Sequence, residues 1–352
     1  MMKKIAIAVS GGVDSLVAAY LLKEQGYDVT GIHFLTGYEP KHKTDSRSSS
    51  HPVSTIGEQL DIRVDILNCA EEFKNTVIKY FYTIYSVGQT PNPCMVCNPA
   101  IKFGTVLNHA YSLGASCLAT GHYAKLEKDK TDKIHLLRGK DKTKDQSYFL
   151  AFLTQQQLSA AKFPLGDLTK STVREIAAQK ALNPIENDES QDICFINDKN
   201  YKEFLSNQLN IFERPGDIVD INGQIIGTHK GLHKYTVGQR RGINCPSSEP
   251  YYVVKIDTIL NQLIVGRKDD LRCSEFLVNN INWIIEAPNH PLSIKTRVRY
   301  RSRAFETTVS PLDRKTARVK FNTPQLSVAP GQAAVFYQED EVLGGGWILP
   351  YT

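Results

Sequence analysis

The chain has 352 residues, 41% of them hydrophobic and 22% charged, which is typical of a globular protein and excludes a chain that is disordered or fibrous throughout. Its length predicts two or three domains, and its net charge of +5 permits a nucleic-acid partner without indicating one. It contains no apolar run long enough to cross a membrane. Its seven cysteines cannot all pair with one another within the chain, which suits free thiols in the reducing cytoplasm, and we expect a protein of that compartment.

Short β-rich runs alternate with helical patterns in the first half of the chain. Within this half we also predict the tip of a β-hairpin, at 129–133. Strand–helix–strand alternation is typical of an α/β fold, with a parallel sheet and helices on both faces. Strands are predicted at 3–9, 29–34, 62–67 and 117–120, and helices at 15–25, 71–86 and 100–113.

Past residue 205 the helical periodicity fades, and short β-rich runs recur between turns rich in glycine, proline, asparagine and aspartate. This pattern is typical of small β-barrels. We expect an α/β domain over 1–205, a central β-rich domain over 206–275 and a C-terminal β-barrel over 276–352. The runs lie at 225–226, 251–256, 262–265, 294–300, 317–321 and 333–337.

The predicted strand that ends at Val9 runs directly into the loop SGGVDS and then into a helix. Glycines at such a turn let backbone N–H groups face an anion, and the helix N-terminus adds partial positive charge. The hydroxyls of Ser10 and Ser15 can donate to phosphate oxygens, and Asp14 can help to hold Mg²⁺. The loop matches neither GxxxxGK[ST] nor GxGxxG, and the alternative is a tight turn whose glycines serve only packing.

Two cysteines, Cys94 and Cys97, form a C-x-x-C pattern within QTPNPCMVCNPAIKF. Pro91 and Pro93 favour extended backbone, so we predict a helix that begins only after Asn98. Cys97 would then precede a helix N-terminus, which lowers the pKa of a thiol. A zinc site and a thioredoxin-like pair are alternatives, but we favour a catalytic cysteine with a second thiol nearby.

A distant cysteine, Cys194, lies where an acidic, polar stretch leads into a short apolar run. Such a position suits a movable segment that carries a thiol towards Cys97. The alternative is a buried, inert side chain between Ile193 and Phe195, and spacing alone does not choose between the two.

Basic residues occupy every odd position from Lys295 to Arg303. If this segment is one strand, its cations project from one face at intervals of about 7 Å, which suits the phosphates of an RNA backbone. The alternative is an edge strand protected by charge. A second basic group, at 229–241, is either part of the same surface or ordinary exposed charge.

The loop SGGVDS resembles the pyrophosphate loop of the N-type ATP pyrophosphatases, which cleave ATP between its α and β phosphates and adenylate a substrate oxygen. Further motifs follow in order: TPNPCMVCNPAIKF, ATGHYA, KDQSYFL, SQDICFI, VGQRRGI, PGQAAVFY and LGGG. Together they resemble the bacterial tRNA-specific 2-thiouridylases across essentially the whole chain.

The resemblance implies that the wobble uridine of tRNA (position 34) is converted to 2-thiouridine. In that family ATP adenylates the C2 oxygen of the base, so that AMP becomes the leaving group. Sulfur arrives as a persulfide on a cysteine that corresponds to Cys194, and the nucleophile corresponds to Cys97. Attack on the persulfide would release sulfur to C2 and leave a disulfide between the two cysteines.

The implied partners are a tRNA with a wobble uridine and a persulfide donor, either a cysteine desulfurase or a sulfur-relay protein, with no membrane involved. The implied cofactors are ATP and Mg²⁺. The family's ATP-binding positions correspond to Ala8, Val9, Ser10, Gly11, Gly12, Val13, Asp14, Ser15, Phe34 and Gly121. Its contacts with the target base and the tRNA correspond to Asn92, Pro93, Cys94, Lys144, Asp145, Gln146, Arg299 and Tyr300.

Cys94 departs from the family pattern, because well-known members have an aspartate at this position. A thiol does not supply that carboxylate's charge, but Cys94, Cys97 and Cys194 could together hold an iron–sulfur cluster. We favour the persulfide route over the cluster. The alternative functions are another pyrophosphate-loop ATP-dependent synthetase or amidating ligase, which would need no paired cysteines, and a non-catalytic RNA-binding protein.

Overall fold

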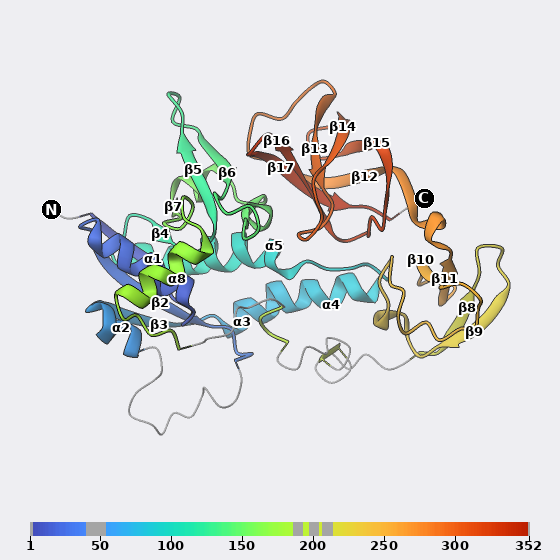
Figure 1. The fold of residues 1–352 in the computed structure, drawn as a ribbon, viewed down its shortest axis with the longest axis horizontal. Helices are drawn as coiled ribbons and strands as arrows, with labels where there is room; N and C mark the ends of the chain where they lie inside the picture. The colour runs from blue at the N-terminus through green and yellow to red at the C-terminus, as the bar shows by residue number, and fades with distance from the viewer. Residues whose placement is uncertain (1–2, 40–53, 186–192, 197–203, 206–213, 351–352) are drawn as a thin grey trace. The chain divides into compact units, whose positions relative to one another are not determined.

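The computed structural model describes residues 3–39, 54–185, 193–196, 204–205 and 214–350 (Figure 1). The chain divides into two compact units. Unit 1 holds residues 1–77, 94–197 and 340–343, and unit 2 holds residues 78–93, 198–339 and 344–352. In the described part of the chain, the helices are all too short or too polar to span a membrane.

A five-stranded parallel sheet forms the centre of unit 1, in the order β3-β2-β1-β4-β7. Its middle strand is buried along almost its whole length, as expected of a strand covered on both faces. The chain passes from β1 to β2 on one side and returns to β4 on the other, so the strand order reverses beside β1. The strands are β1 (Lys4–Ala8), β2 (Asp28–Leu35), β3 (Arg63–Asn68), β4 (Leu118–Ala119) and β7 (Ala161–Lys162).

Three helices share one apolar core with this sheet: α1 (Val13–Glu24), α2 (Ser54–Leu60) and α8 (Lys170–Gln179). The side chains of Leu16 and Val173 are fully buried in that core. The other helices between residues 70 and 159 are α3 (Ala70–Phe73), η2 (Lys74–Ile78), α4 (Lys79–Ser86), α5 (Pro93–Cys97), η3 (Asn98–Val106), α6 (Leu107–Ser112), η4 (Ser147–Leu150) and α7 (Gln155–Ser159).

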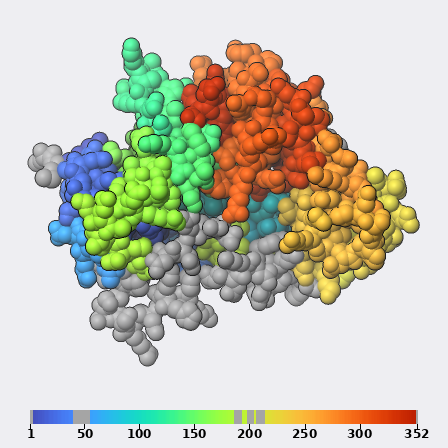
Figure 2. Space-filling view, viewed as in Figure 1, coloured from blue at the N-terminus to red at the C-terminus, as the bar shows by residue number. Residues whose placement is uncertain are grey.

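A hairpin of β5 (Ala124–Lys128) and β6 (Ile134–Arg138) projects into solvent, as Figure 2 shows for the segment coloured between blue-green and green. Its turn is fixed by the Asp129 carboxylate, which accepts hydrogen bonds from the N–H groups of Thr131 and Lys133. The predicted hairpin tip at 129–133 is confirmed. Strand β6 then pairs with the first residues of β17 (Glu341–Ile348).

Unit 2 contains a closed β-barrel in the order β12-β15-β14-β13-β16-β17, and β12 pairs back with β17. Closure leaves these strands without an exposed edge. The C-terminal β-barrel predicted from the sequence is therefore confirmed. Its other strands are β12 (Arg272–Trp283), β13 (Leu292–Arg297), β14 (Phe305–Pro311), β15 (Ala317–Leu326) and β16 (Ala333–Gln338).

A second sheet of unit 2 has the order β10-β11-β8-β9 and encloses a small core around Ile218, Val253 and Leu263. Helix α4 also belongs to this unit, because its Tyr80 ring lies 5.4 Å from the ring of Trp347. The elements of this part are β8 (Gly216–Val219), β9 (Ile225–His229), η5 (Leu232–Lys234), β10 (Tyr252–Asp257), β11 (Gln262–Gly266) and η6 (Lys268–Leu271).

Candidate functional site

The loop SGGVDS follows β1 where the strand order reverses, and α1 begins within it at Val13. Gly11 has a φ of +95°, which favours glycine. The Ser15 hydroxyl accepts from the Ser10 N–H at 3.2 Å and donates to the Gly12 carbonyl at 3.0 Å. The two serines therefore brace the loop from inside, and its strand–loop–helix geometry suits an anion.

The Asp14 carboxylate in this loop is held by two other elements. Lys170 Nζ, from the start of α8, donates to its two oxygens at 2.7 and 2.8 Å. The Tyr123 hydroxyl donates to Oδ1 at 2.7 Å. The Lys170 side chain is only 8% exposed. Sequence reasoning missed both partners, because neither lies in a motif with a known spacing to the loop.

Gly121 follows β4 and lies against the same loop. A Cβ atom at this position would lie 3.0 Å from the carbonyl carbon of Asp14 and from the nitrogen of Ser15. Phe34, near the end of β2, is half-buried. These residues lie at the carboxyl ends of parallel strands, the edge where open α/β sheets bind ligands.

The helix that carries Cys94 and Cys97 begins earlier than the sequence analysis predicts. It starts at Pro93, and Cys97 has helical φ and ψ of −61° and −42°. The prediction of a start after Asn98 was wrong, because a proline fits the first helical turn, where its missing N–H is not needed.

The expected low pKa of the Cys97 thiol is also contradicted. Cys97 lies inside a continuous helical segment and not at its N-terminus. Burial raises its pKa to about 12, and burial likewise raises the pKa of Cys94 to about 11. A neutral thiol is therefore the resting form of both residues.

Cys194 lies near these two thiols although it is distant in the chain. It is exposed, in the short described segment 193–196; residues 186–192 lie outside the described residues. The next ring, that of Phe195, is anchored 5.7 Å from Phe73 and 6.2 Å from Tyr38. A thiolate at Cys194 would raise the pKa of both Cys94 and Cys97, so the three thiols interact electrostatically. We refer to Cys94, Cys97 and Cys194 as the thiol cluster.

Lys102 supplies the positive charge of this thiol cluster. It lowers the pKa of Cys94, Cys97 and Cys194, and in Cys94 and Cys97 this opposes the effect of burial. Its Nζ lies 3.5 Å from Nε2 of His122. Sequence reasoning placed this lysine within a motif but assigned it no role.

His122 is buried and connects the thiol cluster with the strand end at Gly121. Its Nδ1 lies 2.7 Å from the hydroxyl of Thr120. Because a lysine only donates, Nε2 accepts from Lys102 and Nδ1 carries the ring proton. Burial, together with Lys102, holds the pKa of His122 well below its usual value, so the ring is neutral.

The arrangement of the cysteines bears on the iron–sulfur alternative. All seven cysteines are free thiols. Within the described ranges, no group of three or more His, Cys, Asp or Glu side chains is arranged to hold a metal ion. Cys94, Cys97 and Cys194 therefore do not fit a cluster as ligands in this arrangement.

The strand predicted over 294–300 is shorter than expected. Strand β13 ends at Arg297, whose guanidinium donates to the carbonyl oxygens of Tyr300 and Ser302 in the following turn. The prediction that all basic residues from 295 to 303 share one strand face was therefore wrong. Arg299, Arg301 and Arg303 are exposed within or just after this turn.

The segment Lys144–Gln146 is a turn with internal contacts. The buried Asp145 carboxylate accepts from Arg138 Nε at 3.0 Å and from the Ser147 N–H at 3.1 Å. The Gln146 side-chain oxygen accepts from the N–H of Tyr123 at 3.0 Å. These two side chains stabilise the turn.

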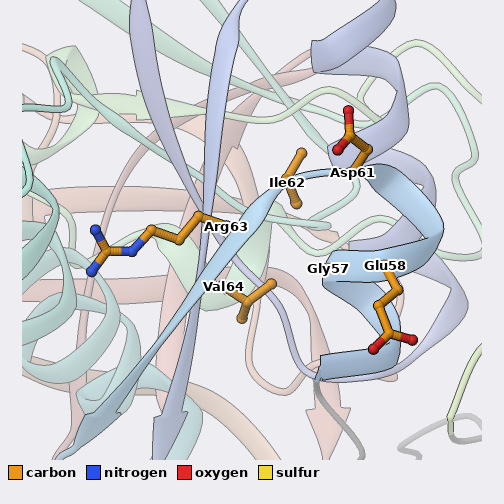
Figure 3. Close-up of a pocket in the computed structure, with 6 residues that line it drawn as sticks. All are labelled: Gly57, Glu58, Asp61, Ile62, Arg63 and Val64. Carbon is orange, nitrogen blue, oxygen red and sulfur yellow. The ribbon is translucent and has the colours of Figure 1, made fainter.

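An open hollow lies where α2 ends and β3 begins (Figure 3). It occupies the amino end of β3, whereas ligands of parallel sheets bind at the carboxyl ends. Its charged side chains diverge, with Arg63 pointing away from Asp61 and Glu58. None of its lining residues belongs to the site described above: they are Gly57, Glu58, Asp61, Ile62, Arg63 and Val64.

Comparisons with known proteins match the whole chain. The family model described as tRNA methyl transferase HUP domain matches residues 3–198, the tRNA methyl transferase PRC-barrel domain matches 202–267, and the aminomethyltransferase beta-barrel domain matches 273–348. A protein of Desulfosudis oleivorans named tRNA-specific 2-thiouridylase is 49% identical over 98% of this chain and 94% of its own length. One of Geobacter metallireducens with the same name is 44% identical over 98% and 96%.

Proposed function

Because this chain belongs to the tRNA-specific 2-thiouridylase family and transfers sulfur to uridine in tRNA, we propose that its target is the C2 oxygen of the wobble uridine (position 34). The observation that carries this proposal is that Cys97 interacts electrostatically with both Cys194 and Lys102, while Lys102 Nζ lies 3.5 Å from His122, the residue after Gly121. Unit 1 contains both the phosphate loop and the two thiols, so one unit can activate the uridine with ATP and also supply the sulfur.

The first step is adenylation. Residues 8–15, Phe34 and Gly121 bind ATP, with phosphates on the loop and adenine against Phe34. The C2 oxygen attacks the α phosphorus and pyrophosphate leaves, which makes AMP the leaving group at C2. Asp14 fits a role beside Mg²⁺, because magnesium bound to nucleotides needs only one or two carboxylates, and Asp14 Oδ2 keeps acceptor capacity beside Lys170.

The second step is sulfur transfer. The Cys97 thiolate attacks the inner sulfur of a persulfide on Cys194, the sulfur–sulfur bond breaks, and a Cys97–Cys194 disulfide forms as hydrosulfide leaves. Hydrosulfide attacks C2, AMP departs with the former C2 oxygen, and loss of a proton completes the thiocarbonyl. The sulfane sulfur is reduced by the two cysteines, so a reductant must restore both thiols after each turnover.

Recognition of tRNA involves Cys94 of the thiol cluster and parts of the chain outside it. We assign the target base to Asn92, Pro93 and Cys94, and the tRNA to the turn at 144–146 and to Arg299 and Tyr300 of the barrel. Exposed arginines suit phosphate contacts, and a tyrosine ring suits stacking with an unpaired base. We assign three domains, over residues 1–205, 206–275 and 276–352. The reaction takes place in the cytoplasm. A cysteine desulfurase or a sulfur-relay protein delivers the persulfide to Cys194.

Mass analysis of tRNA nucleosides tests this function. The purified protein is incubated with tRNA, ATP, Mg²⁺ and a persulfide donor, in parallel with Cys97→Ser and Cys194→Ser variants. We expect 2-thiouridine and AMP with the parent protein only. AMP and pyrophosphate without a sulfur-containing nucleoside would favour an amidating or other synthetase.

A further inference from the structure

One turn of π-helix separates Cys97 from Lys102. The π-helix η3 spans Asn98–Val106, and Cys97 is its N-cap. A π-helix closes its hydrogen bonds between residues five apart, so Lys102 lies about one turn beyond Cys97 on the same side. In an α-helix with 3.6 residues per turn, Lys102 would lie about 140° around the axis from Cys97.

This uncommon backbone is tied to neighbouring segments by side-chain hydrogen bonds. The Gln157 amide donates to the carbonyl oxygens of Pro99 at 2.8 Å and Phe103 at 3.0 Å. From within η3, the Asn98 amide donates to the carbonyl of Phe149 at 3.0 Å. These hydrogen bonds help to hold the register between Cys97 and Lys102.

Lys102 interacts electrostatically with the thiols, and its Nζ lies 3.5 Å from the neutral imidazole of His122. In the described part of the chain, no carboxylate forms an ion pair with Lys102. The other ionisable groups that act on the cluster are Cys69 and Cys94, which raise the pKa of Cys97, and Glu39, which raises the pKa of Cys194. Each of these groups disfavours a sulfur anion, so Lys102 is the charged side chain among the described residues that favours one.

We propose that Lys102 is the positioning charge that stabilises the sulfur anions of Cys97 and Cys194, and that the π-helical turn of η3 places it there. The inference deepens the proposed function and rests on it for the roles of the two thiols. A neutral His122 is part of the arrangement, because a protonated ring 3.5 Å away would repel the ammonium group.

The test measures thiol reactivity at each cysteine, with no tRNA, ATP or sulfur donor present. The full-length protein and its Lys102→Gln, Lys102→Met and Lys102→Arg variants are alkylated with iodoacetamide from neutral to alkaline pH, and the rate at each cysteine is read by peptide mass spectrometry. Lys74→Gln is the matched control, because Lys74 is an exposed lysine of the other π-helix, η2. Cys245 of unit 2 is the internal reference.

We expect both neutral variants to slow alkylation of Cys97 and Cys194 by about ten-fold or more and to move their rate profiles to higher pH. Lys102→Arg restores both profiles, while Lys74→Gln and the Cys245 rate do not change. Unaltered profiles in the neutral variants, with circular dichroism spectra like that of the parent protein, would overturn the inference. Because no substrate is present, that result would leave the proposed function intact, whereas the nucleoside assay with the cysteine variants tests the function alone.

Discussion

Lys170 Nζ lies 2.7 and 2.8 Å from the two carboxylate oxygens of Asp14, inside the loop that follows β1. The pair is partly shielded, since the side chains of Lys170 and Asp14 are 8% and 34% exposed. The Tyr123 hydroxyl holds the same carboxylate from a third direction. A carboxylate that is fixed in this way needs little reorganisation during phosphoryl chemistry.

We predict that Lys170→Met weakens both the fold and the adenylation step. Removal of one partner of a shielded ion pair costs about 1–3 kcal/mol of unfolding free energy here, less than for a fully buried pair because Asp14 is partly exposed. Pyrophosphate release should fall by about 10²-fold. The exposed pair of Lys23 and Asp61 provides the control, and Lys23→Met should leave pyrophosphate release unchanged. Equal effects of the two variants on that rate would contradict the role of Lys170.

Gly121→Ala tests the contact between the end of β4 and the loop. The added Cβ would lie 3.0 Å from backbone atoms of Asp14 and Ser15, so the loop must move. We expect weaker ATP binding, measured by calorimetry, with a modest loss of stability. Gly114→Ala is the control, because its φ of +81° makes an alanine strained while nothing lies within 4 Å of the new Cβ. It should lower stability by about 1–2 kcal/mol without changing ATP affinity.

The arginines around the turn after β13 should differ in role, with Arg297 stabilising the turn and the exposed arginines binding tRNA. Arg297 holds two carbonyl groups of the turn, so Arg297→Ala should cost about 1–3 kcal/mol of unfolding free energy. Replacement of the exposed Arg299 by alanine should leave stability nearly unchanged and weaken tRNA binding. The slope of log affinity against log salt should fall by about one for each phosphate that the variant no longer binds. An unchanged salt slope would remove this turn from the tRNA surface.

His135 makes the stability of unit 1 depend on pH. Its pKa is raised by hydrogen bonds to the carboxylates of Glu341 and Asp129. A raised folded pKa stabilises the fold fully below the unfolded value of about 6.5, and this contribution is lost as the pH rises through the folded value. His135→Gln should therefore reduce the gain in unfolding free energy between about pH 8 and pH 6, measured by denaturant titration. The exposed His290→Gln is the control, and identical pH dependence in parent and His135→Gln would refute the assignment.

The elements that local chemistry dictates were predictable from the sequence. The strand, the SGGVDS loop and helix α1 are contiguous, so apolar periodicity and glycine placement are sufficient to locate them. The hairpin tip at 129–133 was predictable for the same reason, because the Asp129 carboxylate stabilises the turn through hydrogen bonds to the backbone N–H groups of nearby residues. In both cases the information lies within a few residues of the feature.

Two predictions failed because the same residues support more than one local structure. Pro93 fits an extended segment, yet it begins α5, since proline is tolerated in a first helical turn. The alternating charges from 295 to 303 fit a strand, but Arg297 instead closes a turn through backbone carbonyl groups three and five residues further along the chain.

The electrostatics of the thiol cluster were not accessible from the sequence. Lys102 lies five residues beyond Cys97, a spacing that indicates opposed sides in an α-helix and one face in the π-helix that forms here. Lys170 reaches Asp14 across 156 residues. Neither the π-helical register nor a contact at such separation has a local sequence signal. The pKa of Cys97 was predicted in the wrong direction because burial of its thiol, which raises the pKa, has no such signal either.

The most direct test is the redox state of Cys97 and Cys194 after a single turnover. The protein, carrying a persulfide on Cys194, is mixed with ATP and tRNA without reductant, quenched in acid, and digested for mass analysis of its cysteine peptides. We predict one Cys97–Cys194 disulfide for each 2-thiouridine formed. Formation of 2-thiouridine while both cysteines remain free thiols, or by the double Cys97→Ser, Cys194→Ser variant, would contradict the proposed chemistry.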